Sequence, residues 1–283
     1  MRKSILLLFT VFTQLVAIAQ VSPKQDHVIK ILAIGNSFSE DGIENYLYDL
    51  ALSTGKEMII GNLYIGGAPL SLHVKNANEN AENYQYRKIG LDGTKVTTKN
   101  VSISQALDNE NWDYISFQQA SSLSGKYDVV MENLPVLVSY VREKVHPETQ
   151  FVYHQTWAYQ HDSNHKGFAN YDRSQLTMYN AIADVSKKLS KLGYFKYIIP
   201  AGTAIQNART SSVGDTFTRD GYHLQLDYGR FTAACTWYEK IFDEDVRKNS
   251  FKPEKVTELQ AKIAKEAAHK AVRKPYKVSK VKL

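Results

Sequence analysis

Apolar runs of strand length alternate with helical stretches along most of this chain, and this alternation constrains the fold more than any other feature. Five such runs occupy residues 28–35, 57–67, 112–117, 150–159 and 194–202. Strands separated by helices indicate βαβ units, because neighbouring parallel strands need a crossover and a helix provides it. We therefore predict an α/β fold of three layers, α/β/α, with a parallel sheet covered on both faces.

Helical periodicity and turn residues mark the segments between these runs. A polar excursion follows the second run, and its stretch LDGT, residues 91–94, predicts a hairpin with an Asp-Gly turn. Within the helix over 127–145, we expect a bend or a break near Pro135. The expected helices occupy residues 43–55, 102–111, 127–145, 172–193 and 228–242.

The first twenty residues, MRKSILLLFTVFTQLVAIAQ, combine a positive start, an apolar stretch and a small-x-small site at residues 17–19. This pattern is typical of a secretory signal peptide, so we expect residues 1–19 to be removed and the protein to be exported to the bacterial periplasm or beyond. The apolar stretch is short and polar residues follow it, so no stable membrane anchor is expected after cleavage. Cys235 is the only cysteine, which excludes an internal disulfide and any multi-cysteine metal site.

The net charge of +6 is unevenly distributed along the sequence. From residue 247 to the end there are twelve basic and three acidic residues, whereas residues 4–246 carry 21 and 26, a net charge of −5. We predict a main domain over residues 27–245 and a basic C-terminal helix and tail over 246–283, docked as an appendage with a frayed end. No nucleic-acid partner is expected, because the main domain has neither a basic stripe nor a recognised binding motif.

Ligands of an open parallel sheet bind beyond the carboxyl ends of the strands, where loops lead into helices. The predicted loops at this edge carry polar side chains and glycines. In chain order they contain Gly35-Asn36-Ser37, Gly66-Gly67, Gln118-Gln119, His154 with Trp157, and Asp220-Gly221-Tyr222-His223.

This set contains the groups that acyl transfer requires, with Ser37 as the candidate nucleophile. A histidine takes the serine proton and a carboxylate orients the histidine, and these roles fit His223 and Asp220. The anionic tetrahedral intermediate needs fixed donors, which the backbone N–H groups of Ser37 and Gly67 and the amide of Gln118 can supply. This chemistry requires no metal and no cofactor.

The order of these blocks resembles the SGNH/GDSL hydrolase superfamily across residues 28–242. Gly-Asn-Ser after the first strand, a glycine pair after the second, a polar amide after the third and Asp-Gly-Tyr-His late in the domain carry the resemblance. It implies a flavodoxin-like sheet of five parallel strands, and a catalytic triad of Ser37, His223 and Asp220. The stretches WDYISFQQ and QTWAY resemble a branch found in secreted bacterial proteins as a domain of unknown function.

The third block departs from the pattern of that superfamily, which is typically Gly-x-Asn-Asp with the asparagine completing the oxyanion hole. This chain has Phe117-Gln118-Gln119-Ala120 at that place, without an asparagine. A glutamine amide offers the same donor on a longer stem. Gln118 is therefore the predicted donor, with Gln119 as the alternative.

Four side chains are predicted to bind substrate at this edge: Gln119, His154, Trp157 and Tyr222. Aromatic rings can stack on sugar faces, although packing in the core explains the aromatic residues at least as well. The stretch HDSNH, residues 161–165, contains two histidines, but polar loop histidines without a fixed ligand geometry are common. No metal site is predicted.

The sequence thus predicts a serine esterase that cleaves a small-molecule or glycan ester, with acetyl on a carbohydrate as the candidate substrate. One alternative is a non-catalytic glycan-binding module on the same fold, which would keep the aromatic edge without needing the triad. A second alternative is a phosphate or nucleotide binder at the turn of residues 35–37. The stretch GNSFSEDG has neither a GxGxxG motif nor a P-loop lysine, which counts against it.

Overall fold

The computed structural model describes residues 28–283, so the predicted signal peptide lies outside the described residues. The strands form one seven-stranded sheet in the order β4-β3-β2-β1-β5-β6-β7. The five strands from β2 to β7 in this order run parallel, which confirms the predicted flavodoxin-like arrangement. These parallel strands are β1 (Ile29–Gly35), β2 (Met58–Tyr64), β5 (Tyr114–Phe117), β6 (Gln150–His154) and β7 (Tyr197–Ile199).

An antiparallel hairpin of β3 (Tyr84–Ile89) and β4 (Lys95–Val101) extends the sheet beside β2. The predicted Asp-Gly turn joins the two strands, and Gly93 has the positive φ of 75° that this turn needs. β4 is exposed over most of its length and forms the edge of the sheet. The charges of Lys95 and Lys99 on this edge oppose pairing with another chain.

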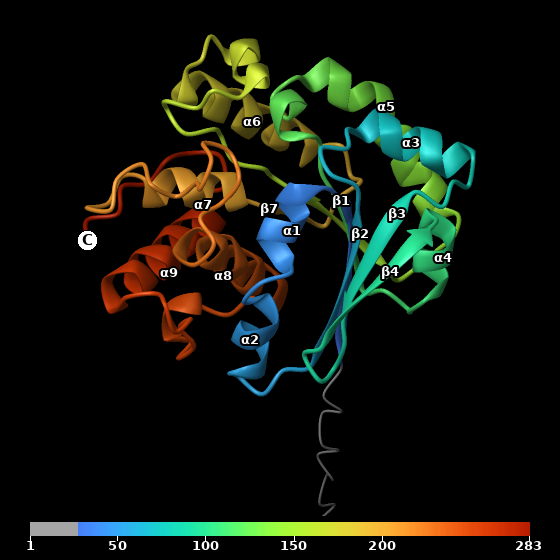
Figure 1. Ribbon diagram of the computed structural model, residues 1–283, viewed down its shortest axis with the longest axis horizontal. Helices are drawn as coiled ribbons and strands as arrows, with labels where there is room; N and C mark the ends of the chain where they lie inside the picture. Colours follow the sequence, from blue (N-terminus) through green and yellow to red (C-terminus); the bar gives the residue numbers. More distant parts are fainter. Residues whose placement is uncertain (1–27) are drawn as a thin grey trace, which may run out of the picture.

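Helices cover both faces of the sheet and complete the three predicted layers (Figure 1). Alternation along β1 places Leu32 and Ile34 in one apolar cluster and Ile31 and Ala33 in the other. One face carries α1 (Ser37–Ile43), α2 (Leu47–Leu52), α8 (Tyr228–Phe242) and α9 (Glu258–Arg273). The other carries α3 (Leu70–Asn78), α4 (Ile103–Asp108) and α5 (Tyr127–Arg142).

The remaining helices lie around the β7 side of the sheet and in the connecting loops. None of the helices between residues 28 and 283 is long and apolar enough to cross a membrane. Of the remaining helices, the two longer ones are α6 (Gln175–Leu189) and α7 (Ala201–Ala208). The three short 3₁₀ helices are η1 (Ser121–Leu123), η2 (Lys166–Tyr171) and η3 (Val246–Lys248).

The helices differ from the prediction in four places. Instead of one helix over 43–55, α1 begins at Ser37 and is separated from α2 by Tyr46, whose backbone is left-handed with a φ of 63°. α5 runs through Pro135 without interruption. α3 and α7 were not predicted, because the first is largely polar and the second contains small residues that follow Pro200.

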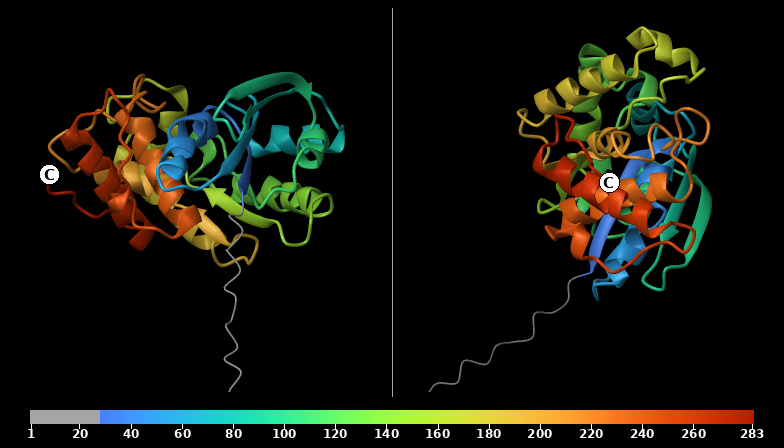
Figure 2. Two further views of the ribbon diagram at one scale, coloured as in Figure 1. Left: turned by 90° about the horizontal axis from the view of Figure 1, so that it is seen from below. Right: turned by 90° about the vertical axis from the view of Figure 1, so that its left-hand side faces the viewer.

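The C-terminal residues are part of the core rather than a frayed appendage. On α9 the buried face consists mainly of alanines, and these small residues let the helix pack closely on α7 and α8 (Figure 2). Beyond it, Ser279 donates its N–H to Oδ1 of Asn207 at 2.6 Å, and Val281 donates to Oγ1 of Thr210 at 2.9 Å. The prediction of a frayed end was wrong, because these hydrogen bonds and the burial of Val281 hold the last residues.

Candidate active site

Ser37 lies at the carboxyl end of β1, as the first residue of α1. Gly35 permits the close packing before it, because a Cβ at that position would lie 2.4 Å from Oγ of Ser39. The side chain of Asn36 caps α1 by accepting the N–H of Phe38 at 3.0 Å. The end of the strand and the capped helix together place the Ser37 hydroxyl at the edge of the sheet.

Asp220 and His223 occupy the loop that leads into α8, and local hydrogen bonds fix its shape. Thr218 and Leu224 pair across the loop in an isolated antiparallel bridge. One carboxylate oxygen of Asp220 accepts the N–H groups of Tyr222 and His223 at 3.1 and 2.7 Å. The other oxygen lies 2.6 Å from Nδ1 of His223. The carboxylate therefore holds both the turn and the imidazole.

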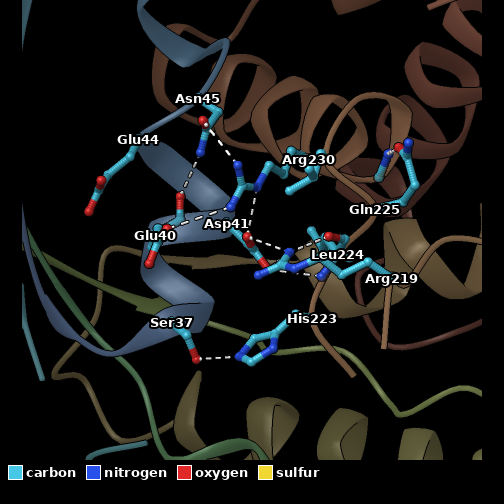
Figure 3. Close-up of polar contacts among 12 residues, drawn as sticks. Ser37, Glu40, Asp41, Glu44, Asn45, Arg219, His223, Leu224, Gln225 and Arg230 are labelled. Atoms are coloured by element: carbon cyan, nitrogen blue, oxygen red, sulfur yellow. Dashed lines mark hydrogen bonds and ion pairs between the residues drawn. The ribbon is translucent and has the colours of Figure 1, made fainter. Parts of the chain in front are cut away.

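The two segments meet where Oγ of Ser37 lies 2.8 Å from Nε2 of His223 (Figure 3). Because Nδ1–H donates to Asp220, Nε2 carries the lone pair that can accept the serine proton. Burial raises the pKa of Asp220, but hydrogen bonds from His223 and from the backbone outweigh it, so the pKa is lower than usual. The structure thus brings the three predicted residues into one chain of hydrogen bonds that ends on an ionised carboxylate.

A second chain of hydrogen bonds is buried beneath Ser37. Asn36 donates from Nδ2 to the backbone oxygen of Ala68 at 3.0 Å, and its Oδ1 accepts Nε2 of Gln118 at 2.7 Å. Oε1 of Gln118 lies 2.9 Å from Nδ1 of His154, so that nitrogen must carry the proton. Burial lowers the pKa of His154 to about 3, which keeps the ring neutral. Asn36, for which the sequence predicted no role, therefore ties the loop after β1 to the loop after β2.

The positions of Gln118 and Gln119 differ from the prediction that one of them faces the substrate as an oxyanion donor. Gln118 is 2% exposed and does not line the cavity beside Ser37, since its amide nitrogen donates to Asn36. Gln119 is also buried, and its Oε1 accepts the N–H groups of Leu70 and Ala120 at 3.0 and 2.8 Å. Both amides connect loops to one another instead of facing solvent.

His154 and Trp157 are likewise buried, which corrects the prediction that they bind substrate. Trp157 stacks on Phe38 with ring centroids 4.3 Å apart, and its indole N–H donates to the backbone oxygen of Tyr222 at 2.7 Å. Its rings therefore fill the core behind the loop of His223. Tyr222 is the one predicted substrate-binding residue that lines the cavity.

The cavity beside Ser37 has a volume of about 390 Å³. Gly66 and Gly67 form part of its wall, and Gly67 has a φ of 67° with no atom within 4 Å of a Cβ placed there. Several lining residues were not predicted, among them Tyr64, Ser121, Ser122 and His165. The two serines directly follow the third block, so their position in the sequence was a usable signal. His165 is far from any strand end, and only the fold brings it here.

Asp41 forms a buried ionic cluster one helical turn after Ser37 (Figure 3). Its carboxylate accepts Nη1 of Arg219 at 3.1 Å, Nε of Arg230 at 2.7 Å and the N–H of Leu224 at 2.8 Å. Two guanidinium groups and a backbone donor satisfy the carboxylate, so its burial is tolerated. The cluster fastens the loop of His223 and the start of α8 to the helix that begins with Ser37.

The histidines of the stretch HDSNH do not converge on a common point. His161 is exposed and lies 2.8 Å from Oδ2 of Asp215, whereas His165 lines the cavity. Among residues 28–283 a different group, Glu239, Asp245 and His269, has ligand atoms within 4.8 Å of one another. Nδ1 of His269 lies 2.8 Å from Oε1 of Glu239, and Arg247 forms an ion pair with Asp245, so the group fastens η3 and α9 to α8.

Together these features define a three-layer α/β protein with a Ser-His-Asp chain of hydrogen bonds at the carboxyl edge of its parallel sheet. The chain belongs to the family described as Domain of unknown function (DUF4886), which matches residues 30–271. It is similar to the crystal structure of a DUF4886 family protein from Bacteroides uniformis ATCC 8492. The TM-score is 0.89 at 51% sequence identity, covering 90% of this chain and 98% of that chain.

More distant solved structures include members of the SGNH/GDSL hydrolases, the superfamily that the motifs resemble. A putative platelet activating factor from Streptococcus pneumonia has a TM-score of 0.46 at 18% identity, covering 78% of this chain and 86% of that chain. A GDSL-like lipase from Bacteroides thetaiotaomicron VPI-5482 has a TM-score of 0.43 at 9% identity, covering 75% and 86%. The chain has no match among curated proteins.

Proposed function

We propose that this protein is a serine hydrolase that cleaves acyl esters, with Ser37 as nucleophile, His223 as general base and Asp220 as the orienting carboxylate. The observation that carries the proposal is the unbroken chain from Oγ of Ser37 through His223 to Asp220, with links of 2.8 and 2.6 Å. A glycan-binding module does not require a serine placed against an imidazole, so this geometry favours an enzyme over the binding module.

In the proposed reaction Oγ of Ser37 bonds to the ester carbonyl carbon while its proton passes to Nε2 of His223. When the tetrahedral intermediate collapses, its bond to the alcohol oxygen breaks and His223 protonates that alcohol. Water then attacks the acyl-enzyme and gives its proton to His223. Collapse of the second intermediate breaks the bond to Oγ, returns the proton to Ser37 and releases the carboxylic acid.

The oxyanion of both intermediates is assigned to the backbone N–H groups of Ser37 and Gly67. Ser37 is the first residue of α1, so its N–H is one of those at a helix start that lack an intrahelical acceptor. Gly67 lines the same cavity on the opposing loop. Asn36 joins the two loops through Ala68, so Gln118 contributes by orienting Asn36 rather than by contacting the substrate.

A short acyl group on a polar alcohol suits this cavity, with acetyl on a carbohydrate as the leading candidate. Glycines and Ala120 leave space close to Ser37, whereas hydroxyl groups, the imidazole of His165 and the ring of Phe38 line much of the rest of the wall. A long acyl chain would need a continuous apolar surface, because its burial is what provides binding free energy. We also propose that the protein is exported, as the N-terminal pattern predicts; a mature protein starting after residue 19 is then expected.

The test is hydrolysis of p-nitrophenyl acetate by the purified protein and by Ser37→Ala. We expect the wild type to hydrolyse the ester and the variant to lose at least about 10³-fold in kcat, because the nucleophile is absent. Ser71→Ala is the matched control, since Ser71 is an exposed serine on α3. A fluorophosphonate probe should label Ser37, identified by peptide mapping. An inactive wild type, or activity that survives in Ser37→Ala, contradicts the proposal.

A further inference from the structure

A second hollow of about 500 Å³ adjoins the cavity of Ser37. It lies between Gln160 with residues 162–165 on one side and residues 218–222, the loop that carries Asp220, on the other. His165 and Tyr222 line both spaces, so these two side chains form the boundary between them. A substrate held at Ser37 can therefore continue past this boundary into the second hollow.

The ring of His165 is held in one orientation at this boundary. It packs against Tyr159 with ring centroids 4.8 Å apart and against Tyr222 with centroids 4.7 Å apart. Nδ1 accepts the N–H of Gly167 at 3.0 Å. Because the ring also closes its own backbone turn in this way, it requires no ligand to become ordered. Preorganisation of this kind lowers the entropy lost when a ligand binds.

The same hydrogen bond determines where His165 carries its proton. Since Nδ1 is an acceptor, a neutral ring must be protonated on Nε2. Burial and the neighbouring His223 lower the pKa of His165, which keeps the ring neutral near pH 7. Within residues 28–283, Nε2 has no hydrogen-bond partner. His165 thus offers a fixed, uncharged donor at the junction of the two spaces.

The second hollow favours an uncharged ligand that is rich in oxygen. Its wall includes amides of Gln160 and Asn164 and the hydroxyl of Ser163, which can exchange hydrogen bonds with alcohols. It also includes the carboxylates of Asp162 and Asp220 and the guanidinium of Arg219, and the charge of Arg219 is already paired with Asp41. The two carboxylates therefore leave the wall unfavourable to an anion. A polyhydroxylated ring fits this mixture of donors and acceptors better than an apolar or an anionic group.

We propose that the alcohol part of the ester is a neutral polyhydroxylated group, such as a sugar, which extends into the second hollow and accepts a hydrogen bond from Nε2 of His165. This inference rests on the proposed esterase function. His165 is then a residue that determines specificity, because its donor is satisfied by a hydroxylated alcohol and left unpaired by an apolar one.

The test compares two esters of similar size, a monoacetylated methyl glucoside and cyclohexyl acetate, which differ in their hydroxyl groups. We expect the wild type to prefer the glucoside ester in kcat/KM. His165→Phe keeps an aromatic ring without the donor, and we expect the preference to fall about tenfold, mainly through KM. His165→Gln retains a donor and should restore part of the preference. His161→Phe is the matched control, since His161 lines neither space.

Three outcomes distinguish this inference from the proposed function. If the wild type hydrolyses both esters equally well, or if His165→Phe lowers both rates by the same factor, the assignment of His165 is wrong while the esterase stands. If His161→Phe shifts the preference as much as His165→Phe, the effect is not specific to the boundary. If neither ester nor p-nitrophenyl acetate is hydrolysed, the proposed function fails and this inference fails with it.

Discussion

Asp41 accepts the backbone N–H of Leu224 at 2.8 Å, and Leu224 is the residue that follows His223. Asp41 lies four positions after Ser37 on α1, so one helical turn connects the serine to the carboxylate that holds the histidine loop. Arg219, on the other side of His223, binds the same carboxylate and donates its own N–H to the backbone oxygen of His223 at 2.9 Å. The hydrogen bonds of Asp41 therefore hold the backbone of the His223 loop at a fixed distance from α1. They do so without involving the side chains of Ser37 and His223.

Replacing Asp41 with Asn should lower both stability and kcat. The amide removes the charge that faces Arg219 and Arg230, and breaking a buried ion pair costs about 3 kcal/mol. The loop of His223 would also loosen, and a small misplacement of the imidazole is expected to reduce kcat by about 10- to 100-fold. Urea unfolding and p-nitrophenyl acetate kinetics measure the two effects separately.

Arg230→Gln provides the comparison for Asp41→Asn within the same cluster. Arg230 binds Asp41 from α8, whereas the bonds from Arg219 and Leu224 to Asp41 stay in place. We expect Arg230→Gln to lose stability but to retain more of kcat than Asp41→Asn. Equal losses of kcat in the two variants would show that Asp41 affects activity through stability rather than through the loop.

Gln118 and Asn36 should behave as one unit in a double-mutant cycle. If Gln118 acts by orienting Asn36, Gln118→Ala lowers kcat, and adding it to Asn36→Ala causes little further loss. A direct oxyanion donor at Gln118 would instead give losses that multiply. The measurement is kcat on p-nitrophenyl acetate for the two single variants and the double variant, and multiplying losses would contradict the buried position of Gln118.

Most of the central fold could be predicted from the sequence. The five parallel strands are buried on both faces of the sheet, and burial on both faces requires the continuous apolar runs that the sequence shows. The Asp-Gly turn of the hairpin also had a local signal in residues 91–94. α7 and the packing of α9 were not predicted, since both helices bury mainly small residues and their burial depends on partners distant in sequence. Alanine is only weakly apolar, so a face of alanines at helical spacing does not by itself show that a helix is buried.

The lining of the cavity was predictable where a residue lies in a loop at the carboxyl edge of the sheet, as Ser37, Gly67 and His223 do. It was not predictable where burial decides the role. Gln118 and Trp157 follow strands at the correct edge, yet both side chains turn inward to hydrogen-bond partners from other loops. Position along the chain gives the edge of the sheet, whereas the direction of a side chain depends on tertiary packing.

His154 should make the stability of the protein depend on pH. Its pKa is about 3 when folded and near 6.5 when unfolded, so between these values the unfolded chain binds more protons. Stability is then lost as the pH falls below about 6.5, by about 1.4 kcal/mol per pH unit from this residue. His154→Gln can still donate to Gln118 but cannot titrate. Urea unfolding at pH 7, 6 and 5 should show a smaller decrease for this variant, and an unchanged decrease would contradict a neutral His154.

Gly67 and Gly193 offer a matched pair for testing the oxyanion assignment. Both have a left-handed backbone, with φ of 67° and 76°, and for both no atom lies within 4 Å of a Cβ. Alanine at either position should cost about 1 kcal/mol of stability, because the backbone strain is the same.

Gly67→Ala should differ from Gly193→Ala in activity alone. Gly67 lines the cavity of Ser37, and strain there would move the N–H assigned to the oxyanion, whereas Gly193 lies beyond the end of α6. Loss of one oxyanion donor lowers kcat by about 100-fold or more, and a displaced donor should lose a substantial part of that. Urea unfolding and p-nitrophenyl acetate kinetics on both variants separate the two effects. If the two variants have equal kcat at equal stability, Gly67 does not supply the donor.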